Sequence, residues 1–227
     1  MTVSDSLNRR ALKKAQTHEL ILSVAQSLFT EQGFEDVTIA DIARAADVAV
    51  QTVFNHFATK EELFFEGRAP WVDGPAAAIR SRPAHVAPLT ALRTYLVRLV
   101  EARVSGRCEA ERQRYLTVLE GSEALVIRER RLVREAESRI AAALAEAWRD
   151  QGDPADVETA AQLTAATWTS TIRVVVIDRR VADPTGTDQE AVAAELCALT
   201  DAVLRQLETC LPPFLLATPQ RTATTAA

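Results

Sequence analysis

Residues 46–63 read ADVAVQTVFNHFATKEEL. Apolar side chains recur in this stretch at Val50, Val53, Phe54 and Phe57, which is the i, i+3, i+4, i+7 spacing of one helix face. We therefore predict a helix that begins near Ala49 and buries these four side chains. The opposite face is polar but lacks the Lys and Glu of an ordinary solvated helix, so we expect it to meet a partner. That polar face consists of Gln51, Thr52, Asn55 and His56.

Signals for further short helices surround this stretch. An apolar stripe at helical spacing over residues 20–29 ends before Gly33, a typical C-terminal stop. Thr38 with Asp41, and Thr59 with Glu62, have the spacing of N-terminal capping boxes. The first 66 residues are thus predicted to form several short helices joined by tight turns.

The composition indicates an all-α protein with a sizeable core. Of the 227 residues, 48% are apolar and 25% charged, with only 7 Gly, 9 Pro and 5% aromatic residues. The apolar runs are short and broken by charge, and the N-terminus lacks the apolar core of a signal peptide, so we expect a cytoplasmic protein without membrane contact. Cys108, Cys197 and Cys210 are odd in number and far apart, which predicts reduced thiols rather than structural disulfides.

The charge balance alone argues mildly against nucleic-acid binding. The net charge is −5, and in the first 60 residues six Lys and Arg face seven Asp and Glu. Any DNA binding must therefore come from a local arrangement of charge. Four basic residues precede the first predicted helix, and they form either a basic arm that enters the minor groove or a disordered solubilising tail. They are Arg9, Arg10, Lys13 and Lys14.

Two short helices, a tight turn and a second helix with a polar outer face describe a helix-turn-helix. An α-helix fills the major groove, where amide and hydroxyl side chains hydrogen-bond base edges. Gln51 and Asn55 each offer a donor and an acceptor that match the edge of adenine, and the methyl group of Thr52 can contact thymine. Lys60 opposes the dipole in the first turn of the next helix, which is easier to explain if a phosphate lies nearby.

Residues 17–63 resemble the DNA-binding domain of TetR-family transcriptional regulators. The matching pieces are IL…A..LF.EQGF, VT…IA..A.V, TVFNHF and KEEL. The resemblance implies a dimeric DNA-binding protein, with phosphate contacts from Thr17, Thr38 and Lys60. The implied recognition positions, which touch bases or backbone, are Ala40, Val50, Thr52, Asn55 and His56. We add Gln51 to these positions because its amide can both donate and accept hydrogen bonds.

Three positions depart from the family pattern. Asp47 stands where glycine makes the turn, and Asp tolerates the left-handed conformation that such a turn requires. Ala49 replaces a serine cap of the recognition helix, at a cost of about 1 kcal/mol. Phe54 replaces a tyrosine whose hydroxyl bonds a phosphate. Val50 lies on the apolar stripe but is a base-contacting position in the family, so we expect it to be partly exposed.

We expect four segments along the chain. They are a basic disordered arm (1–16), a helix-turn-helix domain (17–66), a helical ligand-binding and dimerisation domain (67–211) and a disordered tail (212–227). Helices are expected near 86–105, 108–120, 123–150, 154–181 and 188–210. The last two of these helices are our predicted dimer interface, because one carries an apolar stripe and the other is apolar almost all round. The interface residues are Leu163, Ile172, Val192, Leu196, Leu199, Val203 and Leu207.

A ligand pocket in the larger domain is implied by the resemblance. Polar or aromatic groups on otherwise apolar helices are candidates to line it, although such residues are more often plain core. They are Tyr95, Tyr115, Trp168 and Arg173.

The sequence favours a DNA-binding regulator, most simply a repressor released from a palindromic operator by a small molecule. The three histidines are scattered, and neither metal-ligand spacing nor a Gly-rich phosphate loop occurs, so we expect no catalytic residue, metal or cofactor. Two alternatives stay open. One is a helical small-molecule-binding protein or enzyme that retains the helix-turn-helix as a scaffold, and the other is an adaptor whose polar helix face meets a protein.

Overall fold

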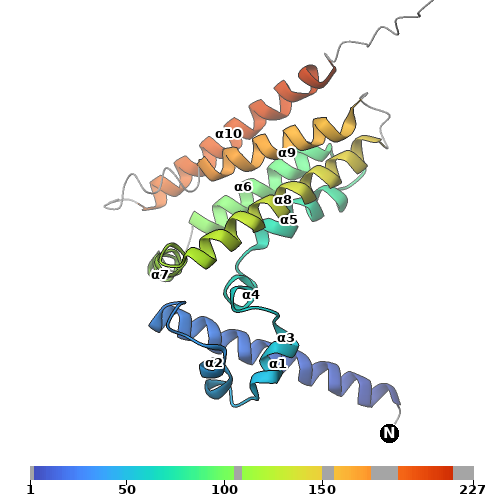
Figure 1. The fold of residues 1–227 in the computed structure, drawn as a ribbon. Coiled ribbons are helices and arrows are strands. Elements are labelled where there is room, and N and C mark those ends of the chain that lie inside the picture. The colour runs from blue at the N-terminus through green and yellow to red at the C-terminus, as the bar shows by residue number, and fades with distance from the viewer. Residues whose placement is uncertain (1–2, 105–108, 150–155, 175–188, 217–227) are drawn as a thin grey trace, which may run out of the picture. The chain divides into compact units, whose positions relative to one another are not determined.

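A computed structural model of the chain describes residues 3–104, 109–149, 156–174 and 189–216. The described residues form helices and no strand, which confirms the predicted all-α class (Figure 1). No helix in these ranges is long and apolar enough to cross a membrane. The helices are α1 (Val3–Gln32), α2 (Ile39–Ala45), α3 (Val50–His56), α4 (Lys60–Phe65), α5 (Pro70–Arg80), α6 (Pro88–Val104), α7 (Glu109–Glu120), α8 (Glu123–Arg149), α9 (Val157–Arg173) and α10 (Gln189–Leu216).

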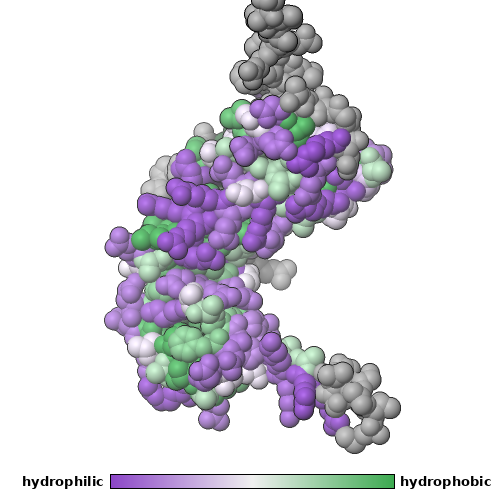
Figure 2. Space-filling model, turned by 45° about the vertical axis from the view of Figure 1, so that its right-hand side comes forward, coloured by the Kyte–Doolittle hydropathy of each residue, from purple (hydrophilic) through white to green (hydrophobic). Residues whose placement is uncertain are grey.

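The chain divides into two compact units. The N-terminal unit combines Met1–Ala69 with Cys108–Arg131, and the C-terminal unit combines Pro70–Arg107 with Leu132–Ala227. This division differs from the predicted domains, because residues 108–131 pack with the N-terminal helices rather than with the rest of 67–211. On both units, hydrophilic side chains cover most of the face visible in Figure 2, with smaller apolar patches between them.

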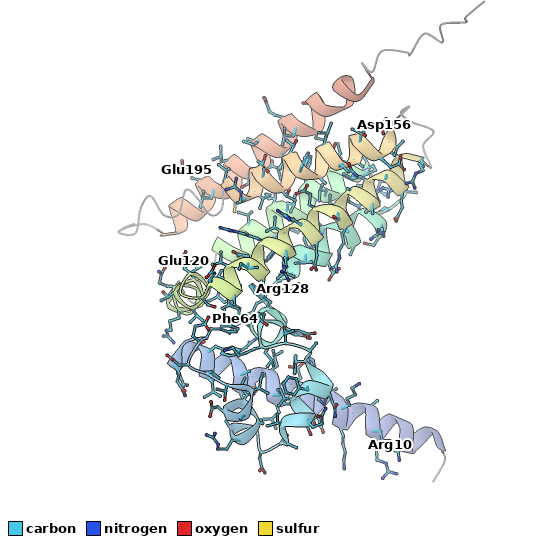
Figure 3. The ribbon with its side chains drawn as sticks, in the orientation of Figure 1. Arg10, Phe64, Glu120, Arg128, Asp156 and Glu195 are labelled. Carbon is cyan, nitrogen blue, oxygen red and sulfur yellow. The ribbon has the colours of Figure 1, made fainter. Side chains whose placement is uncertain are left out.

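An aromatic cluster holds the N-terminal unit together. The ring centroids of Phe29 and Phe34 lie 5.1 Å apart, and Phe64 of α4 lies 6.1 Å and 6.0 Å from them. Tyr115 of α7 stacks on Phe64 at 5.0 Å, and the Arg68 guanidinium lies 5.4 Å from the Tyr115 ring. Figure 3 labels Phe64 on α4. Aromatic pairs stabilise a fold beyond the contribution of the apolar surface that they bury. The stacking of Tyr115 on Phe64 therefore explains why α7 groups with the N-terminal helices.

The local signals for short helices are confirmed. The Thr38 hydroxyl accepts a hydrogen bond from the Asp41 amide at 3.2 Å, and Thr59 accepts one from the Glu62 amide at 3.1 Å. Asp47 adopts the left-handed conformation with φ of 53°, so the turn before α3 survives without glycine. Ala49 occupies the N-cap of α3 and makes no side-chain bond there.

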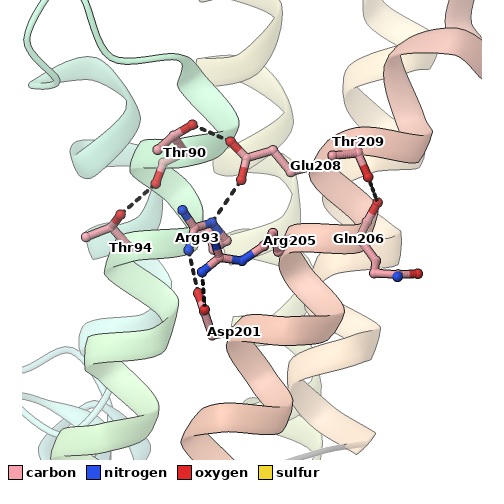
Figure 4. Close-up of polar contacts among 8 residues, drawn as sticks. All are labelled: Thr90, Arg93, Thr94, Asp201, Arg205, Gln206, Glu208 and Thr209. Carbon is pink, nitrogen blue, oxygen red and sulfur yellow. Dashed lines mark hydrogen bonds and ion pairs between the residues drawn. The ribbon is translucent and has the colours of Figure 1, made fainter.

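In the C-terminal unit, α6 packs against α5 and α10, and α10 also packs against α9. Trp168 of α9 is fully buried at the centre of the hydrophobic core. A polar network fastens α6 to α10 beside this core (Figure 4). Arg93 donates to Glu208 at 2.8 Å and pairs with Asp201, which also pairs with Arg205 at 2.6 Å.

Helices extend into both terminal segments that were predicted to be disordered. Helix α1 begins at Val3, so the basic residues between 9 and 14 lie on a helix rather than in a disordered arm. Helix α10 continues through Pro212 and Pro213 to Leu216, so residues 212–216 belong to a helix rather than to the predicted disordered tail. Residues 217–227, and residues 154–155 and 175–181 of the helix predicted at 154–181, lie outside the described ranges.

Candidate nucleic-acid interface

Helix α3 presents a mixed polar and apolar face to solvent. Val53 and Phe57 are buried, but Val50 is 41% and Phe54 49% exposed. The prediction that all four stripe residues are buried is therefore wrong for Phe54, while partial exposure of Val50 is confirmed. The four positions span about 100° of the helix, and this short helix turns only the Val53–Phe57 side to the core. Phe54 is thus an interface candidate that sequence reasoning missed, although its match to a phosphate-bonding tyrosine was a signal.

Gln51 and Asn55 are exposed and bonded to each other. The Gln51 Nε2 donates to Asn55 Oδ1 at 3.2 Å across one helical turn. This bond uses one N–H of Gln51 and one lone pair of Asn55, so each amide retains both donor and acceptor capacity. The pair therefore offers base edges two amides whose orientations are already coupled.

His56 closes the polar face at the end of α3. Its ring centroid lies 5.7 Å from that of His18 on α1, and His18 stacks on Phe57 at 4.4 Å. The Nε2 of His18 lies 3.1 Å from a carboxylate oxygen of Glu66. Burial, with the positive charges of His18 and Lys14, lowers the pKa of His56. Half-buried Thr52 completes the polar face.

The Thr38 hydroxyl at the start of α2 already forms hydrogen bonds within the protein. Thr38 donates to Asp41 Oδ2 at 2.5 Å, and Asp41 pairs with exposed Arg44 at 2.8 Å. The hydrogen bonds from Thr38, followed by Arg44, lower the pKa of Asp41. Thr38 therefore serves first as a cap, while Ala40 is exposed and Thr17 of α1 is half-buried.

Lys60 has a structural role that the sequence did not predict. Its Nζ donates to the carbonyl oxygens of Phe34 at 2.7 Å and Val37 at 3.0 Å, and lies 4.1 Å from the centroid of the Phe34 ring. The ammonium thereby ties the loop between α1 and α2 to the first turn of α4. These carbonyls explain a lysine in an unfavourable dipole position without a phosphate, and one of its three N–H groups remains for another acceptor.

The predicted ligand residues are divided between the two units, although Tyr95 packs against the hydrophobic core that contains Trp168. Tyr115 belongs to the N-terminal unit and the other three to the C-terminal unit. Tyr95 donates its hydroxyl to the Pro70 carbonyl at 3.0 Å, over Gly74, where a Cβ would lie 1.7 Å from the Tyr95 oxygen. Arg173 is exposed near the end of α9. A surface hollow of about 460 Å³ between α8 and α9 is lined by none of the four.

Trp168 is the one ligand candidate with an unexplained polar atom. Its indole Nε1 is buried, and no hydrogen-bond partner for it exists among the described residues. An unsatisfied buried donor costs free energy, so this N–H marks a place where an acceptor would be favoured.

The predicted dimer residues differ in exposure. Leu196 is buried in the core of its own protomer, which leaves little of it for a partner, whereas Leu163 is 50% exposed. Val192 lies outside the residues whose side chains are described. The half-buried members are Ile172, Leu199, Val203 and Leu207.

Comparison with known proteins agrees with the helix-turn-helix geometry of α1–α4. Residues 21–66 match the profile of the family described as "Bacterial regulatory proteins, tetR family". Residues 21–66 therefore form a DNA-binding domain of the TetR type. It is 31% identical over 140 residues to the transcriptional regulator TcmR of Streptomyces glaucescens, an alignment that covers 60% of this chain and 62% of TcmR. It is 39% identical over 59 residues to AcrR of Shigella flexneri, covering 26% of this chain and 27% of AcrR.

Solved structures of repressors share the fold. SmeT in complex with triclosan superposes with a TM-score of 0.53 at 20% identity, covering 83% of this chain and 91% of SmeT. NalD, the secondary repressor of the MexAB-OprM multidrug efflux pump in Pseudomonas aeruginosa, gives 0.50 at 19% identity over 83% of this chain and 95% of NalD. The alignments to the curated relatives thus span less than two thirds of each relative, while the fold match extends over most of the chain.

Proposed function

We propose that this chain is a sequence-specific DNA-binding repressor that works as a cytoplasmic homodimer. The observation that carries the proposal is the exposed, mutually bonded pair Gln51 and Asn55 on α3, which buried Val53 and Phe57 hold in place. Amide pairs of this kind suit the adenine edge in the major groove. In this role Val50 and the methyl of Thr52 supply apolar contacts to thymine, and His56 lies at the end of the same face.

Phosphate contacts position the recognition helix in this proposal. Thr17 lies half-buried on α1, and Thr38 caps α2. Lys60 turns two N–H groups to loop carbonyls, so it contributes one N–H and its charge to a phosphate rather than a full bidentate contact. Phe54 adds apolar surface but, unlike tyrosine, no hydroxyl. Such contacts fix the protein on the duplex without reading its sequence.

The dimer is proposed to form through α9 and α10. Leu163 of α9 is exposed, and Leu199, Val203 and Leu207 of α10 are half-buried in the single protomer. A second protomer would remove this apolar surface from water. Association of two copies also supplies the two-fold symmetry that a palindromic operator requires.

The ligand is proposed to be a small, largely apolar molecule that carries a hydrogen-bond acceptor. Its site would lie in the C-terminal unit near Trp168, whose buried Nε1 needs such an acceptor. The fold match to SmeT, whose structure contains triclosan, also supports a ligand-responsive repressor. The match of residues 21–66 to a family of regulatory proteins favours this regulator over an enzyme with a retained helix-turn-helix.

A comparison of two variants tests whether α3 reads bases. Asn55→Ala should change the preferred base at one position of each half-site, at a cost of about 1–3 kcal/mol for that base pair. Thr17→Val, which is nearly isosteric, should weaken binding to all DNA sequences alike, because it removes only a phosphate contact. Binding is measured against a library of single-base changes in the selected site. The same uniform loss in both variants would contradict the division into base readers and backbone anchors.

A further inference from the structure

The N-terminal half of α1 is a charged helix beside the recognition helix. Residues 9–16 are all exposed, and Figure 3 shows Arg10 on the part of α1 that runs beyond the other helices of the N-terminal unit. Among the described residues, none forms an ion pair with Arg10, Lys13 or Lys14. These three cations are therefore not neutralised within the part of the chain that the structure describes.

The positive charges occupy one side of this helix. At about 100° per residue, the basic positions and Thr17 fall within an arc of about 140°. Exposed Glu19 falls on the opposite side of α1. The basic arc also includes the position at which a backbone contact is proposed, so the charges extend an anchor rather than standing apart from it. In order around the helix, the arc contains Arg9, Lys13, Thr17, Arg10 and Lys14.

The basic side adjoins the end of α3. Lys14 and His18 of α1 line a surface hollow of about 300 Å³ together with His56 of α3. The charge of Lys14 also contributes to the lowered pKa of His56. A duplex bound to the polar face of α3 would therefore bring its backbone close to this side of α1.

A helix at these residues changes the kind of contact that is possible. An α-helix with side chains is about 10–12 Å wide, whereas the minor groove of B-DNA is about 6 Å wide. The helix cannot enter that groove as an extended arm would. From Arg9 to Thr17 it is about 12 Å long, which matches about three phosphates of one strand at about 3.4 Å each along the axis.

We propose that residues 9–17 of α1 form a rigid phosphate-binding ridge that grips the DNA backbone next to the groove occupied by α3. The ridge rests on the proposed function, because it extends the contact of a DNA-bound recognition helix. It adds affinity and salt dependence without sequence preference. It also explains how a protein with a net charge of −5 approaches a polyanion, since the charge is local and one-sided.

The test compares salt dependence in three forms of the full chain. In the triple variant Arg10→Gln, Lys13→Gln, Lys14→Gln, helix propensity is retained because Gln is close to Lys and Arg. Arg9 is left unaltered because it already has an interaction within the chain. The matched control removes the same charge from exposed positions of α8. It is Arg130→Gln, Arg131→Gln, Arg134→Gln.

The dissociation constant for the selected duplex is measured from 50 to 300 mM salt, a range of the order over which phosphate contacts change affinity about 10³–10⁵-fold. The triple variant should reduce the slope of log K against log salt by about two to three units, at about 0.9 per phosphate, and keep the base preference. The control should keep the slope of the unaltered chain. If the unaltered chain itself shows no salt-dependent binding, the proposed function fails. If it binds steeply and the triple variant keeps that slope, only the ridge fails.

A second variant separates a rigid ridge from a flexible basic arm. Ala11→Pro keeps every charge but breaks the helix before it, which detaches Arg10 from the helical side. The ridge predicts a smaller slope for this variant as well. A slope equal to that of the unaltered chain, together with a loss in the triple variant, would overturn the helical ridge in favour of a flexible polycation.

Discussion

Replacement of Lys60 by alanine should loosen the loop between α1 and α2. The Nζ makes two charge-assisted hydrogen bonds, at 2.7 and 3.0 Å, to the carbonyls of Phe34 and Val37, and it lies over the Phe34 ring. Hydrogen bonds of a charged group contribute about 1.5–3 kcal/mol each, and an exposed cation–π contact about 0.5–1 kcal/mol. Because Lys60 is half-buried and water can replace part of these contacts, we expect a loss of about 2 kcal/mol in all.

Hydrogen exchange of the N-terminal unit is the assay for this change. The three tryptophans, at 71, 148 and 168, all belong to the C-terminal unit, so their fluorescence does not report on the loop. A loss of about 2 kcal/mol corresponds to about 30-fold faster exchange of amides protected by the loop contacts. Arg44→Ala is the matched control, because its exposed pair with Asp41 is worth under about 1 kcal/mol. Unchanged exchange in Lys60→Ala would refute the structural role of the ammonium.

Three further changes have defined outcomes. Ala49→Ser should stabilise the N-terminal unit by about 1 kcal/mol, because the N-cap has extended backbone and no side-chain bond; slower exchange of the α3 amides checks this. His56→Gln should flatten the pH dependence of stability. The pKa of His56 in the folded protein lies below its unfolded value of about 6.5, so the wild-type protein loses stability as the pH falls below that value. An equal change in unfolding free energy from pH 8 to pH 5 in the wild type and in His56→Gln would contradict this prediction. Arg93→Met should cost about 2 kcal/mol in denaturant unfolding followed by tryptophan fluorescence, because two half-buried carboxylates lose their cation. Arg80→Met, at an exposed pair, should cost under about 1 kcal/mol, and equal losses would count against the network.

The predictions that succeeded rest on local chemistry. Thr38 and Thr59 act within a few residues of themselves, so spacing alone predicted the caps. The left-handed turn at Asp47 was predicted from the family resemblance, together with the tolerance of Asp for that conformation. The polar face of α3 was likewise visible in its sequence, because helical spacing decides which side chains share a side.

The features that escaped prediction depend on contacts between distant segments. The carbonyl partners of Lys60 lie 26 and 23 residues away, and the stack of Tyr115 on Phe64 joins helices separated by the whole of α5 and α6. The exposure of Phe54 follows from how α3 is rotated on the core, which periodicity fixes only to within a few tens of degrees. No residue pattern within one helix contains this information.

The most direct measurement of the central claim is selection of duplex DNA from a random pool by the purified full chain at moderate salt. The account predicts enrichment of a palindromic site whose half-sites lie about 34–36 Å, or a multiple of that distance, apart, as two recognition helices of a dimer require. Asn55→Ala should select a site altered at one position in each half. A folded, dimeric chain that enriches no sequence, with or without candidate ligands, would contradict a sequence-specific repressor.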